Sequence, residues 1–244
     1  MGFRFGSGSF GPPVEYRTLD SIRPSLLDPH CSGPDPVYAI AMDTGKLSHL
    51  AALLERNLLF GVVTYAAGTL GEEPVRSQGH VHMKARGNGI SPPEIYEIWS
   101  GRAIVYMQEF DKDDPGRCYA VQAGPGEVVI VPPDWAHATI SADPATPLTF
   151  GAWCDRQYGF DYKGVRAHRG LAWFPLVGEN GEIRWVANSR YYPSKLIEKK
   201  PGDYRDLGIR KGVPIYTHFE QDPDVFLYVS NPLLKSEIWN GFIP

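Results

Sequence analysis

Between residue 58 and about residue 155 the chain is a series of short apolar runs rich in β-branched and aromatic residues. Glycine, proline and aspartate separate these runs at fairly even intervals, which is typical of an antiparallel sandwich or barrel and not of alternating strands and helices. We therefore predict an all-β domain. The expected strands are residues 59–66, 75–84, 94–100, 103–109, 118–122, 128–131, 138–141 and 148–154.

The segments on either side of this region show other patterns. Residues 1–13 are rich in Gly, Ser and Pro and predict a loose arm. Residues 36–42 predict a strand, and residues 45–57 carry leucines at helical spacing, with Asp43 or Thr44 as the expected N-cap. Towards the C-terminus, residues 171–176, 183–186 and 225–229 predict a few further strands in an otherwise polar, turn-rich tail.

No repeat or low-complexity linker interrupts the chain, so we interpret its 244 residues as one domain. Residues 1–57 form its N-terminal arm and helix, residues 58–162 its barrel core, and residues 163–244 its C-terminal strands and tail.

Composition excludes several classes of function. The formal net charge is −4 and no basic patch is evident, which argues against nucleic acid or an anionic membrane as partner. The three cysteines are widely spaced, so they form neither a disulfide framework nor a metal knuckle, and we expect buried small side chains. The N-terminus lacks the apolar run of a signal peptide, and no apolar run has transmembrane length. A cytoplasmic protein fits these features.

Four potential metal ligands lie at the ends of the predicted strands. His80 and His82 are two residues apart, so both imidazoles face the same side of a strand. Glu94 follows a loop rich in Gly and Pro, Tyr96 shares its face, and His137 follows a Pro-Pro pair. Because a lone His-x-His pair is usually a surface or core feature, the prediction depends on all four ligands converging.

Imidazole nitrogen and carboxylate oxygen together suit a divalent ion of borderline hardness, such as Fe²⁺, Mn²⁺, Ni²⁺, Co²⁺ or Zn²⁺. We expect one divalent ion, Fe²⁺ first, with Mn²⁺, Ni²⁺ or Zn²⁺ as alternatives. In a six-coordinate ion, four protein ligands would leave two positions for water or substrate.

The spacing of these residues resembles the two motifs of the cupin superfamily. The resemblance implies a double-stranded β-helix, which is a jelly-roll barrel, here with one N-terminal helix and a C-terminal extension. Three departures stand out. An inserted loop, residues 84–93, separates His82 from Glu94, Asp134 replaces the usual glycine, and Ser141 replaces the usual asparagine.

A narrower resemblance is to the cupin-type glucose-6-phosphate isomerases of archaea and some bacteria. It rests on GHVHMK (79–84), EIY (94–96) and VPPDWAH (131–137), and it spans about residues 67–162. The resemblance implies that His80, His82, Glu94 and His137 bind the metal and that Glu94 takes part in proton transfer. It also implies that Tyr96 lies beside the substrate.

The same resemblance implies that Ser77 and Gly79 help to hold the substrate phosphate, and their hydroxyl and exposed N–H are suitable donors. Phe160 departs from the family, which has histidine before the Asp-Tyr of this segment. Lys84 and Arg86, on the inserted loop, are candidate replacements for the lost cation, although either is equally well explained as a solvated loop charge.

Three further side chains are weaker candidates. Tyr162 matches a family tyrosine and is a candidate contact to the substrate or a packed aromatic ring. Trp135 is expected to form a wall of the pocket. Glu97 is out of phase with Glu94, so we expect it to face away from the site as a surface or interface charge.

The resulting hypothesis is a metal-dependent aldose–ketose isomerase of a phosphorylated hexose, with glucose 6-phosphate and fructose 6-phosphate as the first pair. This reaction belongs to glycolysis and gluconeogenesis. Two routes between C1 and C2 are compatible with the sequence. One is proton transfer through an enediolate, and the other is a direct hydride shift. The alternatives are an Fe²⁺ cupin dioxygenase and a non-catalytic cupin that binds sugar phosphates. By analogy with the family, a homodimer is expected.

Overall fold

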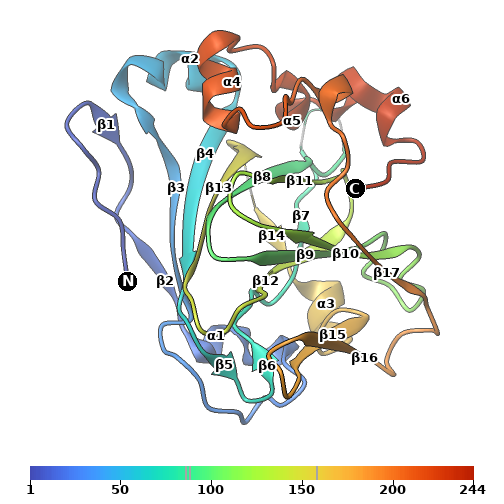
Figure 1. Ribbon diagram of the computed structural model, residues 1–244. Coiled ribbons are helices and arrows are strands. Elements are labelled where there is room, and N and C mark those ends of the chain that lie inside the picture. Colours follow the sequence, from blue (N-terminus) through green and yellow to red (C-terminus); the bar gives the residue numbers. More distant parts are fainter. Residues whose placement is uncertain (86, 88, 158) are drawn as a thin grey trace.

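Two β-sheets face each other in the computed structural model, which describes residues 1–85, 87, 89–157 and 159–244 (Figure 1). The larger sheet has the order β1 (Ser9–Phe10), β3 (Tyr38–Lys46), β4 (Leu58–Tyr65), β13 (Leu148–Asp155), β8 (Glu94–Ser100) and β11 (Val128–Val131), and β2 (Glu15–Arg17) also pairs with β3. The smaller sheet has the order β12 (Ala136–Ser141), β9 (Ala103–Gln108), β10 (Cys118–Ala123) and β17 (Leu196–Lys199).

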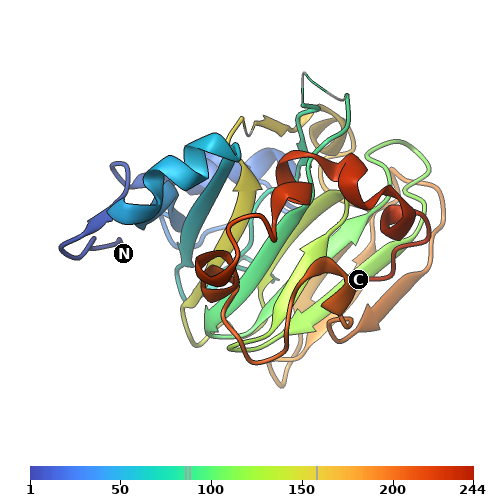
Figure 2. The same ribbon diagram turned by 90° about the horizontal axis from the view of Figure 1, so that it is seen from above.

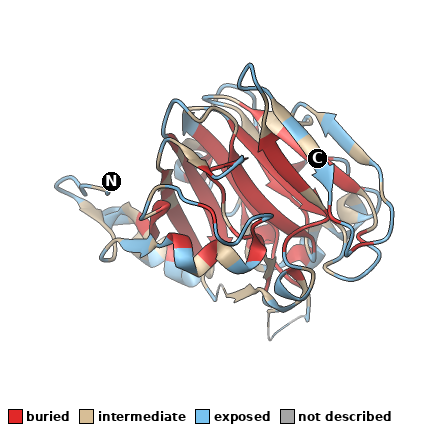
Figure 3. Ribbon diagram, turned by 90° about the horizontal axis from the view of Figure 1, so that it is seen from below, coloured by how far each residue is buried: buried red, intermediate tan, exposed pale blue. Residues whose placement is uncertain are grey.

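Neighbouring strands of both sheets are antiparallel, apart from the parallel pair β10 and β17. Side chains on the two inner faces pack into one apolar core, with Ile98 and Phe150 from the larger sheet meeting Val105 and Val121 from the smaller one. Figure 3 shows that the buried residues follow the strands, whereas the N-terminal arm projects away from them. The predicted all-β barrel is therefore confirmed.

The remaining elements are short. Three two-stranded ribbons join β5 (Thr69–Leu70) to β6 (Glu73–Pro74), β7 (Val81–His82) to β14 (Phe160–Asp161), and β15 (Trp173–Val177) to β16 (Ile183–Ala187). The α-helices are α1 (Leu19–Ile22), α2 (Leu50–Glu55), α3 (Lys163–Ala167), α4 (Ile215–Gln221), α5 (Leu227–Ser230) and α6 (Ser236–Trp239). The 3₁₀ turns are η1 (Arg23–Ser25), η2 (Leu47–His49), η3 (Arg205–Leu207) and η4 (Pro232–Lys235).

Seven of the eight strands predicted between residues 59 and 154 lie within two residues of β4, β8, β9, β10, β11, β12 and β13. The prediction for residues 75–84 is wrong, because only Val81–His82 forms a strand there. Gly79 adopts a φ of +87° just before it, which an extended strand does not permit. Isolated bridges, Arg76 with Ile140 and His80 with His137, hold this segment against β12 instead.

Two further predictions outside the barrel are wrong. Asp43 and Thr44 do not cap a helix, since β3 continues to Lys46 and the helical turns begin at Leu47. Thr44 is buried and its hydroxyl donates to the carbonyl of Phe60 at 3.0 Å. Residues 225–229 do not form a strand either, because their C-terminal part belongs to α5. The run is short and apolar, and periodicity alone does not distinguish a strand from a helix in such a run.

The C-terminal tail covers the outer face of the larger sheet (Figure 2). Phe219 and Phe226 from the tail pack against Trp153, which is fully buried. Glu97 faces this side, as predicted, but it is not a surface charge. It is 7% exposed and its carboxylate accepts a hydrogen bond from the backbone N–H of Ile215 at 2.7 Å, so the tail buries it.

Candidate metal centre

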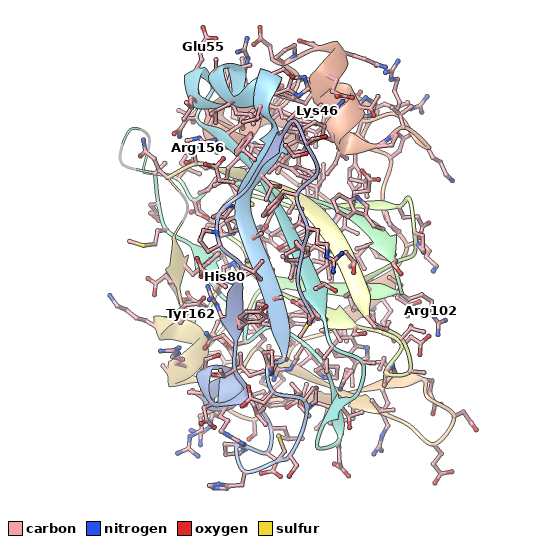
Figure 4. The ribbon with its side chains drawn as sticks, turned by 90° about the vertical axis from the view of Figure 1, so that its left-hand side faces the viewer. Lys46, Glu55, His80, Arg102, Arg156 and Tyr162 are labelled. Carbon is pink, nitrogen blue, oxygen red and sulfur yellow. The ribbon has the colours of Figure 1, made fainter. Side chains whose placement is uncertain are left out.

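Four side chains from separate segments converge inside the barrel. His80 precedes β7, His82 ends it, Glu94 begins β8 and His137 lies in β12. One donor atom from each residue lies within 4.8 Å of the others, and His82, Glu94 and His137 are buried. The residues that were expected to converge thus do so, in a geometry that could hold a metal ion. Figure 4 shows His80 near Tyr162.

Backbone geometry brings the histidine-bearing segments together. The N–H of His80 donates to the carbonyl of His137 at 3.0 Å, and the N–H of His137 donates back at 2.9 Å. Gly79 is required at the preceding position, because a Cβ there would lie 2.8 Å from the side chain of Leu171 in addition to the strain of its positive φ. This reciprocal pair fixes the spacing between the first and last ligand.

Asp134 occupies the turn before His137, at the position where the cupin motif usually has glycine. Asp134 adopts a φ of +67°, a conformation that aspartate tolerates better than most residues. Its carboxylate also accepts a hydrogen bond from the backbone N–H of Ser91 at 3.0 Å. The substitution therefore ties the inserted loop to the turn that carries the last ligand.

Hydrogen bonds to the backbone orient two of the imidazoles. Nδ1 of His82 lies 3.1 Å from the carbonyl of Pro92, and Nδ1 of His137 lies 3.1 Å from the carbonyl of Trp135. Carbonyls only accept, so Nδ1 carries a proton in both rings, and Nε2 points into the cluster. This is the arrangement that ligating histidines adopt.

His80 completes the set of nitrogen donors. Its Nε2 is buried and has no hydrogen-bond partner among the described residues. Burial and the neighbouring His137 and His82 hold the pKa of His80 well below its ordinary value, so the ring is neutral. A buried, neutral, unpartnered imidazole nitrogen costs free energy unless a ligand satisfies it, and a metal ion fits this position.

Glu94 lies at the centre of the cluster. Its Oε2 is 3.1 Å from Nε2 of His82 and 3.3 Å from Nε2 of His137, and it accepts a hydrogen bond from the Tyr96 hydroxyl at 2.6 Å. Burial alone would raise the pKa of Glu94, but the hydrogen bonds from His137 and His82 lower it well below its ordinary value. The carboxylate is therefore ionised and available to a cation.

A contact that the sequence did not indicate involves Cys154. Its thiol donates to Oε1 of Glu94 at 3.0 Å, and burial followed by the Glu94 charge raises the pKa of Cys154 well above its ordinary value. All three cysteines are buried and free, as expected. The pairing of β13 with β8 creates this contact, and no local motif marks it.

A pocket opens on the cluster from the inner face of the larger sheet. Of the residues expected to contact substrate, Ser77, Tyr96 and Tyr162 line it, together with His80 and Glu94. Gly79 lies between Ser77 and His80, as a turn in the backbone. Lys84 is exposed on its loop and does not line the pocket, and Arg86 lies outside the described residues.

Five polar residues of the pocket were missed by sequence reasoning. They are Arg17, Tyr38, Tyr65, Gln78 and Thr139. Arg17 comes from β2, which the pairing of Arg17 with Tyr38 brings to the pocket. No local motif identifies Arg17 as a pocket residue, because its position depends on a strand pairing between distant segments. Trp135, expected as a pocket wall, instead stacks on Tyr119 outside the lining.

Comparisons with known proteins agree on a family. The model of the family described as Glucose-6-phosphate isomerase (GPI) matches residues 30–194. The glucose-6-phosphate isomerases of Pyrococcus abyssi and Pyrococcus furiosus are each 31% identical over 137 residues, which cover 56% of this chain and 66% of each relative. The chain thus spans just under two thirds of the length of the curated relatives it matches.

More distant matches add little. A putative glucose-6-phosphate isomerase 1 of Rhizobium meliloti is 29% identical over 85 residues, 35% of this chain and 36% of that protein. Among solved structures, an oxalate oxidase covers 51% of this chain and 54% of its own at 14% identity and a TM-score of 0.37, which carries no argument about activity. None of the described helices has the length and apolar character needed to cross a bilayer.

Proposed function

Because the chain belongs to the glucose-6-phosphate isomerase family, we propose that it is a metal-dependent aldose–ketose isomerase of a phosphorylated sugar. Glucose 6-phosphate and fructose 6-phosphate are the first pair to test. The observation that carries the proposal is the convergence of three imidazole nitrogens and one carboxylate at the base of a pocket, with Nε2 of His80 buried and unpartnered among the described residues.

The four converging side chains would hold the ion. Three neutral imidazoles and one carboxylate leave a net charge of +1 on a divalent metal, which when bound would polarise the substrate carbonyl as a Lewis acid. This donor set fits Fe²⁺, Mn²⁺, Ni²⁺ or Zn²⁺, and we propose Fe²⁺ as the first to test.

The residues around the cluster would handle the proton. Glu94 is an ionised carboxylate beside the open pocket, and the Tyr96 hydroxyl, 2.6 Å from it, is the nearest proton donor to its Oε2. Burial and the Glu94 charge raise the pKa of Tyr96 well above its ordinary value, so this hydroxyl keeps its proton. Proton transfer through Glu94 predicts loss of a C2 deuterium label to solvent, whereas a hydride shift predicts its retention.

The rest of the pocket provides groups that suit the phosphate. The Ser77 hydroxyl lines the pocket and accepts from the N–H of Thr139 at 3.2 Å, so a polar oxygen is held at this position. Tyr162 and Arg17 line the same pocket. Arg17, whose guanidinium also pairs with Glu15 at 2.9 Å, comes from outside the region that the family model matches. Arginine binds phosphate oxygens in a bidentate manner, so we assign Arg17 to the phosphate end of the substrate.

The test combines metal analysis with a coupled assay. Purified protein is analysed for its metals, loaded with Fe²⁺ or Mn²⁺, and assayed on glucose 6-phosphate, fructose 6-phosphate and mannose 6-phosphate. We expect turnover of at least one sugar phosphate, lost in His137→Ala together with the metal. Absence of turnover with every metal and every substrate would contradict the proposal.

Phe160 supports a second candidate, a non-catalytic protein that binds sugar phosphates. Its ring lies 4.4 Å from the ring of His80, where the resembling family carries histidine, and it supplies no polar atom to the pocket. Under this candidate the wild-type protein binds sugar phosphate without converting it. The variant Phe160→His tests the role of this position, since gain of turnover in the variant alone would favour the second candidate.

A further inference from the structure

A second cleft lies at the end of the molecule where α1, α3, β15 and β16 gather (Figure 1). Four arginines line it: Arg23, Arg166, Arg169 and Arg190. They come from η1, α3, the turn that follows α3 and the loop after β16, so they are brought together only by the fold. Among the described residues, no side chain lines both this cleft and the pocket of the metal centre.

The positive charge of the cleft is largely uncompensated. No carboxylate is among its described lining residues. Arg23 forms an ion pair with Asp20 at 2.7 Å, whereas Arg166, Arg169 and Arg190 form none within the described parts of the chain. The whole chain carries a formal charge of −4, so this group of positive side chains is opposite in sign to the net charge of the protein. Like charges held close together repel, and a bound anion would relieve that repulsion.

Two of the arginines are held in place by hydrogen bonds. Arg23 donates through Nη1 to the carbonyls of Pro29 and Cys31, each at 2.8 Å. Arg166 donates through Nε to Oε1 of Gln78 at 3.0 Å, and its guanidinium lies 5.0 Å from the centre of the Tyr162 ring. Both groups are therefore positioned before any ligand arrives, which reduces the entropy lost on binding.

The backbone at the other two arginines, Arg169 and Arg190, is also held by hydrogen bonds. Arg169 has a φ of +54°, and its N–H donates to the carbonyl of Arg166 at 3.0 Å. Asn188 is buried and its amide donates to the carbonyls of His168 and Leu171, each at 3.0 Å, while its Oδ1 accepts from the N–H of Arg190 at 3.1 Å. The side chains of Arg169 and Arg190 thus extend from anchored backbone into the cleft.

We propose that this cleft is a binding site for a small phosphorylated molecule, distinct from the metal centre. Guanidinium groups match the geometry of phosphate oxygens, and several around one cleft suit a ligand with a doubly charged phosphate. The apolar side chains of Leu26 and Phe174 also line the cleft and provide a surface for the organic part of the ligand. The acidic chain as a whole disfavours nucleic acid, which would need an extended basic surface.

Equilibrium dialysis of the metal-loaded protein with ³²P-labelled inorganic phosphate, at constant ionic strength, tests the site. The double variant Arg169→Gln/Arg190→Gln removes two charges from the cleft. We expect the phosphate site of the cleft to lose at least about tenfold in affinity, because charge-assisted hydrogen bonds to phosphate are lost, whereas phosphate binding in the pocket of the metal centre should be unchanged. The variant Arg169→Lys/Arg190→Lys, which keeps the charge but not the forked geometry, is expected to fall between the glutamine variant and the wild type.

The matched control is Arg102→Gln/Arg205→Gln, which removes the same charge from two exposed arginines outside the cleft. Arg102 lies on the far side of the molecule from His80 and Tyr162 in Figure 4. The control should bind phosphate as the wild type does. Equal binding by the cleft variants and the control, or no binding by the wild type at millimolar phosphate, would overturn the proposal. Neither result bears on the proposed isomerase activity, which is measured separately.

Discussion

Two glutamates on one strand provide a sharp test of the metal centre. Glu94 and Glu97 lie three residues apart on β8, both are buried, and each can be replaced by the nearly isosteric glutamine. Glu94 faces the three histidines, whereas Glu97 lies on the opposite face and accepts a hydrogen bond from the N–H of Ile215. We expect Glu94→Gln to lose the metal and Glu97→Gln to retain it.

The expected magnitude follows from mass action. Removing a group that only orients a metal ligand typically costs about 10- to 100-fold in affinity, so loss of the ligand charge itself should cost at least about 100-fold. At a free metal concentration of about 100 times Kd, binding stabilises the native protein by about 2.7 kcal/mol. A 100-fold weaker site would retain only about 0.4 kcal/mol of that. The difference of about 2.3 kcal/mol corresponds to roughly 5–9 °C in Tm for a chain of this size.

The assay is thermal unfolding of each variant with and without the metal that elemental analysis finds in the wild-type protein. The wild type and Glu97→Gln should show the full increase in Tm, and Glu94→Gln only a small part of it. Metal content after gel filtration provides a second, independent measurement. If Glu97→Gln lost the metal and Glu94→Gln kept it, the assignment of the two faces of β8 would be wrong.

Three further predictions concern the core, the hydrogen bond at the carboxylate and the tail. Replacing the fully buried Trp153 by alanine should lower the free energy of unfolding by about 3–5 kcal/mol in urea titrations, whereas Trp99→Ala, at a position 41% exposed, should cost much less. Tyr96→Phe removes the 2.6 Å hydrogen bond to Glu94 and should weaken metal binding about 10-fold; an unchanged Kd would refute the orienting role of this hydroxyl. Burial raises the pKa of Glu97, so the native state binds its proton more tightly than the unfolded state does, and wild-type stability should fall as the pH rises from about 4.5 through the raised value. That component of the slope should be absent in Glu97→Gln, and identical pH profiles would contradict it.

The barrel strands could be predicted from the sequence because their apolar residues pack into a core whichever partner each strand finds. The period of two placed Glu94 and Tyr96 on one face and Glu97 on the other, and both assignments agree with the structure. The burial of Glu97 could not be predicted, since it depends on the C-terminal tail folding back over β8. Local periodicity says which way a side chain points but not what covers it.

Contacts between distant segments account for the other omissions. Arg17 reaches the pocket because β2 pairs with β3, and Cys154 reaches Glu94 because β13 pairs with β8. The four arginines of the second cleft span 168 positions, from Arg23 to Arg190, and form no cluster in the sequence. The strand predicted at residues 75–84 failed for a local reason, since Gly79 requires a conformation that ends an extended segment.

The position of β8 between the metal centre and the tail has a thermodynamic consequence. A shift of this strand by one residue would place Ile95 among the histidines and Tyr96 beneath α4, so its register is constrained from both sides. A metal ion bound at this site and the docked tail would therefore favour the same alignment of one strand. If a metal ion binds there, the two would by reciprocity strengthen each other, and the last thirty residues would contribute to metal affinity without supplying a ligand.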